Sequence, residues 1–232
     1  MNKPFFPLLI IFLLLVSCTT ALRVVGGFKN PKVETKSSIN NYINDSSFND
    51  EFENLYFNKL IDSTQISSVL LRALSGEIII FDTNGNRKCY NGNETCSAIA
   101  LTQIETDFES TISDCDVFEE NYTYRFDNLE SLLGELITTN NKNININQLP
   151  KMEYYIVYNW SIFSSSKKRN EEDYAWFKEK IKKFDKDIYI IKINCDLRED
   201  WGLKKNKKLK FKLKKQEDKT YELTLGRIPF EK

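Results

Sequence analysis

Residues 154–196 constrain the fold of this chain most, because pattern, length and turn signals all indicate a strand–helix–strand unit there. Residues 154–160 are a short apolar run rich in aromatic and β-branched side chains, which predicts a strand buried on both faces. From Asn170, which we expect to cap a helix, apolar residues recur at helical spacing: Tyr174, Phe177, Ile181 and Phe184. Residues 187–195 predict a second buried strand, so the three pieces form a right-handed βαβ crossover.

Smaller elements are expected on either side of this unit. Before it, the patterns predict helices, a hairpin and one further strand: helices at 50–61, 64–74, 98–112 and 128–137, a hairpin that turns at Asn84-Gly85, and a strand at 122–126. After it, residues 209–214 and 221–225 alternate between apolar and polar positions, which predicts a terminal hairpin with Glu222 opposite its lysines.

The first seventeen residues have the pattern of a targeting signal. A positive start precedes an apolar stretch at residues 5–16 that is too short to span a bilayer comfortably, and Leu15-Val16-Ser17-Cys18 ends it. Those four residues resemble the lipobox of bacterial lipoproteins, in which the signal is removed before the cysteine and lipid is attached to its sulfur. The resemblance implies a mature chain anchored in a lipid bilayer through Cys18, and Thr19 after it implies the outer membrane, facing the periplasm.

The alternative is an ordinary secretory signal cut after Ala21, which would release a secreted soluble protein. In either case the mature chain leaves the cytoplasm for a compartment in which disulfides form.

Four cysteines follow Cys18: Cys89, Cys96, Cys115 and Cys195. An Asn-Gly turn signal lies between Cys89 and Cys96, so we expect these two to form a local disulfide, and the pairing of Cys115 and Cys195 stays open. Cys195 is in phase with the apolar residues of its strand, which predicts a buried, inert thiol. A metal site is the poorer alternative, because the thiols are scattered and show no paired CxxC spacing.

Composition narrows the possible functions. The chain has no histidine, which excludes serine–histidine and cysteine–histidine catalysis and most zinc sites. Lys and Arg number 33 and Asp and Glu number 33, so the formal net charge of zero argues against a general nucleic-acid binder. Nothing in the sequence implies a cofactor.

From Tyr122 onward the expected order is strand, helix, strand, helix, strand and a terminal hairpin, and Trp160 ends the middle strand before a short loop that opens the next helix. This order is similar to the thioredoxin fold, over the last half of the chain. The resemblance implies a mixed α/β sheet with flanking helices and a redox CxxC motif in that loop. The matching positions here are Ser164-Ser165-Ser166-Lys167, so both redox thiols are missing.

The helix and cis-proline that thioredoxins place after the third strand are missing as well, and so is their last helix. In these features the chain looks like the thioredoxin-like lipoproteins of Bacteroidota-type bacteria. The implied organisation has four parts: a signal peptide at 1–17, a lipid-anchored flexible tether at 18–47, an N-terminal helical and hairpin extension at 48–117, and a thioredoxin-like domain at 118–232.

The lysines of the terminal hairpin allow two interpretations. Lys208, Lys210, Lys212 and Lys214 lie on one face of an alternating strand, where charges can protect a sheet edge from aggregation. They can also form a basic docking face for an acidic partner or for anionic lipid headgroups, extended by Lys204, Lys205 and Lys207.

We therefore expect a non-enzymatic, lipid-anchored protein of the cell envelope, in which a redox-inactive thioredoxin-like domain serves as an interaction scaffold for an unidentified protein. One alternative is an envelope enzyme of another class that uses Asp196, Glu199 and Asp200, since ligands bind at the carboxyl ends of strands in open α/β sheets. A second alternative is an immunity or chaperone-like binder of secreted proteins.

Overall fold

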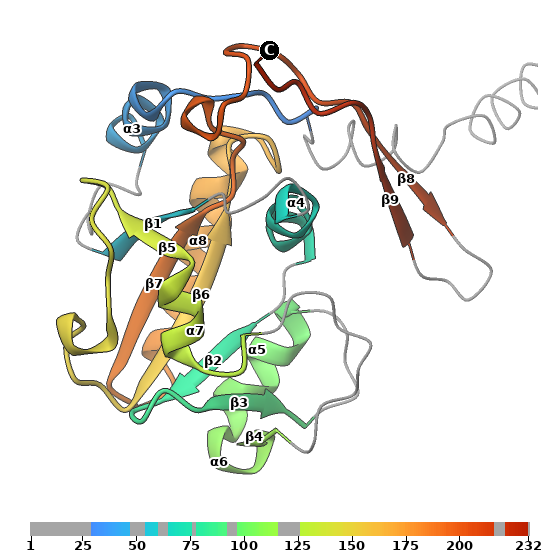
Figure 1. Cartoon of the computed structure of the whole chain (residues 1–232). Helices are drawn as coiled ribbons and strands as arrows, with labels where there is room; N and C mark the ends of the chain where they lie inside the picture. Colours follow the sequence, from blue (N-terminus) through green and yellow to red (C-terminus); the bar gives the residue numbers. More distant parts are fainter. Residues whose placement is uncertain are drawn as a thin grey trace, which may run out of the picture.

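The computed structural model describes residues 29–46, 54–59, 65–75, 78–91, 97–115, 126–215 and 221–231. In this part the chain is a mixed α/β protein with helices on both faces of a seven-stranded sheet of order β4-β3-β2-β6-β7-β1-β5 (Figure 1). Its strands are β1 (Leu55–Asn58), β2 (Ile79–Asp82), β3 (Arg87–Tyr90), β4 (Ile112–Asp114), β5 (Leu136–Thr138), β6 (Tyr154–Trp160) and β7 (Ile188–Asn194). The helices are α3 (Lys36–Asn44), α4 (Gln65–Ser75), α5 (Ser97–Thr106), α6 (Phe108–Thr111), α7 (Leu129–Gly134) and α8 (Lys167–Lys182), with 3-10 turns η2 (Ile146–Gln148) and η3 (Glu199–Trp201).

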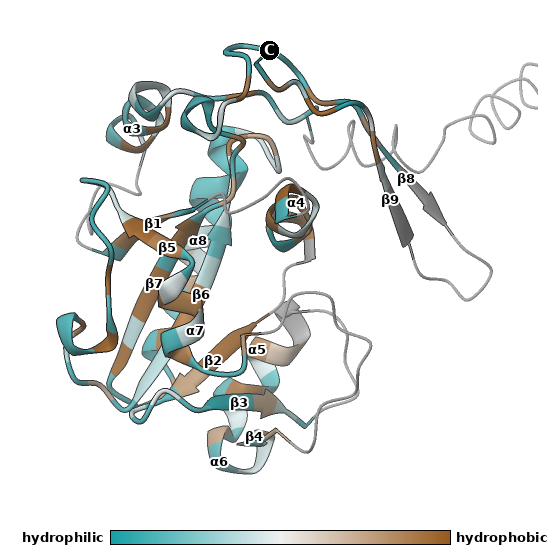
Figure 2. Cartoon of the chain, in the orientation of Figure 1, coloured by the Kyte–Doolittle hydropathy of each residue, from teal (hydrophilic) through white to brown (hydrophobic). Residues whose placement is uncertain are grey.

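The predicted βαβ unit is confirmed as the centre of the sheet. β6 and β7 pair in parallel over seven residues, from Tyr154 opposite Ile188 to Trp160 opposite Asn194, and α8 connects them. Tyr174, Phe177 and Ile181 lie on the buried stripe of α8. Figure 2 shows the hydrophobic colour concentrated on the strands of the sheet, whereas most of α8 is hydrophilic.

Alternation along the strands divides the core into two layers. Ile191 and Ile193 of β7 pack on one face, against α4 and α7, whereas Ile188 and Ile190 pack on the other, against α3, α5 and α8. The first layer includes Ile66, Val69 and Leu70 of α4 and Leu129, Leu132 and Leu133 of α7. The second includes Ile39 and Ile43 of α3, Leu101 and Ile104 of α5, and the stripe of α8.

The predicted helix at 50–61 is wrong where the structure describes it. Residues 55–58 form β1, which pairs in parallel with β7 and antiparallel with β5. All four side chains are buried, and burial on both faces favours a strand over an amphipathic helix. Two other predicted helices are shorter than expected: the one at 98–112 is divided at Asp107, which caps α6, and the one at 128–137 ends at Gly134 before β5.

The sheet combines residues from both sides of the domain border expected at 117/118. β1 to β4 precede that border and β5 to β7 follow it, so the predicted extension supplies four strands of one common sheet. Residues 29–46, expected within a flexible tether, pack on the fold, with Val33 and Ile39 fully buried. Of the strand expected at 122–126 only Phe126 is described, and it lies outside any strand.

The predicted terminal hairpin is present as β8 (Phe211–Lys215) and β9 (Tyr221–Leu225), with Lys214 opposite Glu222 as expected. It forms a separate two-stranded sheet that projects from the body (Figure 1), whereas the thioredoxin resemblance implied a place in the main sheet. The physical reason is that β2 already pairs antiparallel with β6, and β3 pairs with β2. That side of the crossover is therefore occupied.

Candidate functional site

Residues 161–166, here called the serine loop, connect β6 to α8, which begins at Lys167. Ser164 to Lys167 are the positions at which a redox motif was expected to be missing. Ser161 Oγ accepts the backbone N–H of Ser164 at 3.1 Å, and Ser164 Oγ donates to the carbonyl of Ser161 at 3.1 Å. Ser166 caps α8 by accepting the backbone N–H of Arg169 at 3.3 Å. These hydroxyls shape a turn and begin a helix, which is the structural use that serine commonly has at such positions.

Asp196 closes this loop from the carboxyl end of β7. Its side chain is 1% exposed, and its two oxygens accept the backbone N–H of Ile162 at 3.1 and 3.0 Å. Asn194 Nδ2 donates to the carboxylate at 2.8 Å. Burial raises the pKa of Asp196 to about 7, although these hydrogen bonds oppose the shift, and nearby Glu34 raises it further. The buried acid therefore connects the ends of the two strands.

Asn170 joins the same loop to α3. Its Nδ2 donates to Tyr42 Oη and to the carbonyl of Ser161, each at 2.9 Å, and the Tyr42 ring stacks on Trp160 at a centroid distance of 5.9 Å. The prediction that Asn170 caps the helix is wrong, because α8 begins earlier with Ser166 as its cap. The spacing of the sequence could have indicated that Asn170 is buried within the helix: it lies four residues before Tyr174 and so continues the buried stripe of α8.

Cys195 is buried, as predicted, and is not in a disulfide. It is 0% exposed, and its sulfur lies 3.9 Å from Asn58 Nδ2 and 3.8 Å from Asn159 Oδ1. Burial raises the pKa of the Cys195 thiol to about 12. The thiolate needed for exchange chemistry is therefore strongly disfavoured at neutral pH.

The three carboxylates of the rival site do not share an environment. Asp196 is buried and bonded to Ile162, whereas Asp200 is exposed and is held by Arg198, whose Nε donates to Asp200 Oδ1 at 2.9 Å. Glu199 is partly exposed at the start of η3. Arg198 is itself 2% exposed, with its guanidinium 4.6 Å from the centroid of the Phe57 ring, so Asp200 is held by a buried arginine and not by the bonds that hold Asp196.

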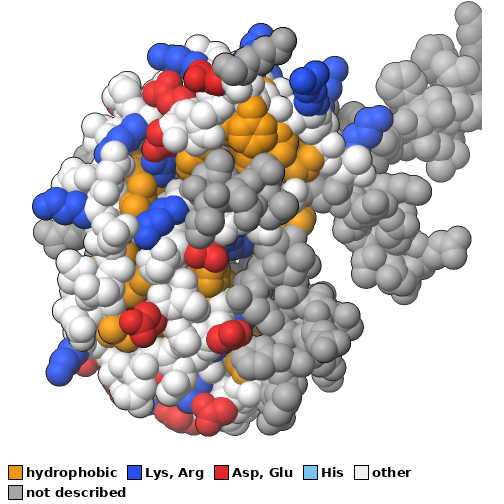
Figure 3. Space-filling model, in the orientation of Figure 1, with side chains coloured by type: hydrophobic (Ala, Val, Ile, Leu, Met, Phe, Trp, Pro, Cys, Tyr) orange, Lys and Arg blue, Asp and Glu red, His pale blue; other side chains and the backbone are white. Residues whose placement is uncertain are grey.

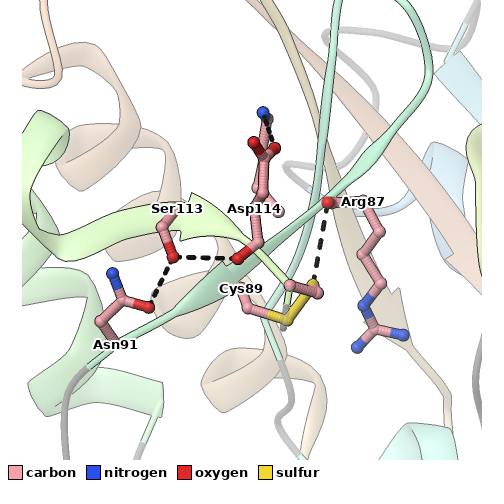
Figure 4. Close-up of a disulfide and its surroundings, with 7 residues drawn as sticks. Arg87, Cys89, Asn91, Ser113 and Asp114 are labelled. Atoms are coloured by element: carbon pink, nitrogen blue, oxygen red, sulfur yellow. Dashed lines mark hydrogen bonds and ion pairs between the residues drawn. A yellow bond between two sulfur atoms is a disulfide. The ribbon is translucent and has the colours of Figure 1, made fainter. Parts of the chain in front are cut away.

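The disulfide predicted between Cys89 and Cys96 is wrong in its partner. Cys89 of β3 is bonded to Cys115, which follows β4, with their Cα atoms 4.9 Å apart (Figure 4). The register places Cys89 opposite Ser113 and Lys88 opposite Asp114, so the neighbouring strand brings Cys115 within reach. Cys96 lies outside the described residues. The bond links β3 to the residue after the edge strand β4, and it is remote in sequence from the loop between β6 and α8.

The lysines of the terminal hairpin lie on an outward face, as the alternation predicted. Leu209 is 0% and Phe211 4% exposed, whereas Lys208, Lys210 and Lys212 are exposed. The side chain of Lys214 lies outside the described part. Cys18 lies outside it as well, so the lipid anchor stays a prediction.

Among the described residues no helix is both long and apolar enough to cross a bilayer. Comparison with protein-family models, with curated proteins and with solved structures gives no match to this chain.

Proposed function

We propose that this chain is a non-enzymatic, lipid-anchored envelope protein whose thioredoxin-like domain has lost thiol chemistry and serves as an interaction scaffold. The observation that carries the proposal is the serine loop after β6. The hydroxyls of Ser161, Ser164 and Ser166 are used in a turn and a helix cap. Cys195, at the end of the neighbouring strand, is a buried thiol with a raised pKa. Thiol–disulfide exchange needs an accessible thiolate, which this corner does not provide.

The arrangement of strands supports the thioredoxin-like part of the proposal. A thioredoxin-like sheet has two parallel crossover strands with a further parallel strand on one side and an antiparallel hairpin on the other. Here β6 and β7 are the parallel crossover strands, and β1 pairs in parallel with β7 on one side. On the other side β2 pairs antiparallel with β6, and β3 pairs antiparallel with β2. The chain order differs, because the hairpin strands precede the crossover instead of following it.

Two measurements test this function. An insulin-reduction assay with the purified protein is expected to show no turnover above the uncatalysed rate, and sustained turnover would overturn the non-enzymatic assignment.

For the anchor, wild type is expected to partition into detergent with the membrane fraction, and the Cys18→Ala variant to lose that partitioning. A mature chain that begins at Leu22 would contradict lipidation.

One observation favours the second candidate, an enzyme that uses carboxylates. The raised pKa of Asp196 is a property that acid–base residues often have. Its burial and its bonds to Ile162 and Asn194 favour a structural role instead. NMR titration of Asp196, Glu199 and Asp200 distinguishes the two: coupled titration of the three groups would support a shared site, and independent titration of Asp196 would contradict it.

A further inference from the structure

A strip of lysines lies at the root of the terminal hairpin. Six lysines and no acidic residue occur between residues 203 and 212, in a chain whose overall charge is balanced. We define the basic surface by the five exposed members of this segment: Lys205, Lys207, Lys208, Lys210 and Lys212. In Figure 3, Lys and Arg side chains lie at the upper right, near the root of β8 and β9, whereas the upper left edge carries both basic and acidic side chains.

Backbone geometry turns these lysines outward. Leu209 and Phe211 point into the protein, at 0% and 4% exposure, so the alternating positions Lys208, Lys210 and Lys212 point to solvent. Within the described residues, no acidic side chain forms an ion pair with any member of the basic surface. The nearest acidic residue on the adjoining segment, Glu34, is 7% exposed and contacts Ser38 and Lys32. Among the described residues, the positive charge of these five lysines is therefore not paired with a carboxylate.

The segment that leads from the N-terminus runs beside this strip. Val33 N–H donates to the carbonyl of Lys207 at 2.8 Å, and Leu209 N–H donates to that of Pro31 at 2.8 Å. The backbones of Lys32 and Lys208 pair in an isolated antiparallel β-bridge. Lys29, the first described residue, follows Cys18 by eleven positions (29 − 18). Eleven residues reach about 36–40 Å at full extension, so an anchor at Cys18 holds Lys29 within that distance of the bilayer. The basic surface lies beside the segment that Lys29 begins.

From this placement we infer that the basic surface docks on anionic phospholipid headgroups of the membrane to which the chain is anchored. The inference rests on the anchor in the proposed function. Lysine is a compact charge on a flexible stem, suited to diffuse attraction by a charged surface, whereas a bidentate site for one carboxylate or phosphate typically uses arginine. A strip of lysines beside the anchored segment fits a lipid surface better than an acidic protein, because the anchor keeps the bilayer within reach of the strip.

The test uses the full chain reconstituted into vesicles of phosphatidylcholine alone or of phosphatidylcholine with phosphatidylglycerol. Amine acetylation read by mass spectrometry reports the accessibility of each lysine. In the anionic vesicles, acetylation of the basic surface is expected to slow by about five-fold or more at low salt, and to recover at high salt. Lys142, Lys151 and Lys182 are exposed lysines outside the basic surface, so their rates are expected to stay unchanged. Lys151 and Lys182 adjoin the amino-terminal ends of β6 and β7, and Lys142 lies in the turn that follows β5.

A pair of matched variants separates docking from general charge. Lys207→Glu/Lys208→Glu/Lys210→Glu is expected to abolish the protection of Lys205 and Lys212. Lys142→Glu/Lys151→Glu/Lys182→Glu changes net charge equally and is expected to preserve that protection. An unchanged unfolding midpoint shows that each variant is folded.

Three results would overturn docking: equal acetylation in both kinds of vesicle, protection that extends to the control lysines, or protection that appears only when envelope proteins are added. The last of these would assign the surface to an acidic protein. Flotation with neutral vesicles reports the anchor separately. A chain that fails to float but is protected by anionic vesicles would contradict the anchor and support docking.

Discussion

Both carboxylate oxygens of Asp196 accept the backbone N–H of Ile162, so a buried acid holds the loop that follows the neighbouring strand. The pKa of this carboxyl is raised to about 7 in the folded state, against an unfolded value near that of free aspartate. The folded state therefore binds more protons than the unfolded state between about pH 4 and pH 7, and stability from this group falls as pH rises through that window. For most aspartates folding lowers the pKa, so their contribution to stability rises with pH.

The unfolding free energy of wild type is accordingly expected to fall by about 2–3 kcal/mol between pH 5 and pH 8 through Asp196. Asp196→Asn keeps one oxygen for the Ile162 N–H and removes the titration, so its unfolding free energy should lack this slope. Urea unfolding of both proteins at several pH values measures the difference. Parallel pH profiles for the two proteins would show that Asp196 does not titrate in this range.

The central crossover could be predicted because its signals are local: an apolar run, a helical stripe and a second apolar run within residues 154–196. β1 could not, because a strand buried between two others differs from a helix mainly through its distant partners, here β5 and β7. Leu55 and Tyr56 follow Phe52 by three and four residues, a spacing that also fits a helix. The same limitation applies to Cys89, whose partner is set by the pairing of β3 with β4 and not by the nearest turn signal.

At the candidate site, the sequence predicted the serine loop, because the apolar run ends at Trp160, and the burial of Cys195, because it is in phase with the apolar residues of its strand. It did not predict that Tyr42 and Asn170 meet there, because α3 was expected to lie in a tether. A polar, asparagine-rich segment gives little signal for packing. Ile39 and Ile43, four residues apart and both buried, are the weak helical stripe that holds α3 on the fold.

The disulfide between Cys89 and Cys115 predicts a specific peptide map. Non-reducing proteolysis and mass spectrometry should find these two cysteines in one linked peptide, and a peptide linking Cys89 to Cys96 would contradict the structure. The bond closes a loop of 26 residues in sequence separation, so the Cys89→Ser/Cys115→Ser variant is expected to lose about 3–4 kcal/mol of unfolding free energy. Wild type measured with reductant is the matched control.

The hydrogen bond between Asn170 and Tyr42 predicts energetic coupling between α8 and α3. Tyr42→Phe removes one acceptor and should cost about 1 kcal/mol of unfolding free energy. Asn170→Ala should cost about 2–3 kcal/mol, because the buried carbonyl of Ser161 also loses its donor. A double-mutant cycle is expected to give a coupling energy of about 1 kcal/mol, and additive effects of the two substitutions would show that α3 is held by its apolar contacts alone.

Two glycines form a matched pair for testing the turn between β2 and β3. Gly85 has φ +80°, and a Cβ there would lie 3.1 Å from Ile146 Cδ1 and 3.3 Å from Leu129 Cβ. The left-handed conformation alone costs a non-glycine residue about 1–2 kcal/mol, so Gly85→Ala should lower the unfolding free energy by at least that amount. Gly134, the last residue of α7, has no heavy atom within 4 Å of an added Cβ.

Gly134→Ala should therefore be neutral or stabilise the protein by up to about 1 kcal/mol, because alanine loses less conformational entropy in a helix than glycine does. Urea unfolding with unchanged slopes compares the two variants directly. If Gly85→Ala proved as stable as Gly134→Ala, the turn would have to adopt a different backbone conformation, and the packing of Gly85 against Leu129 and Ile146 would have to be wrong as well.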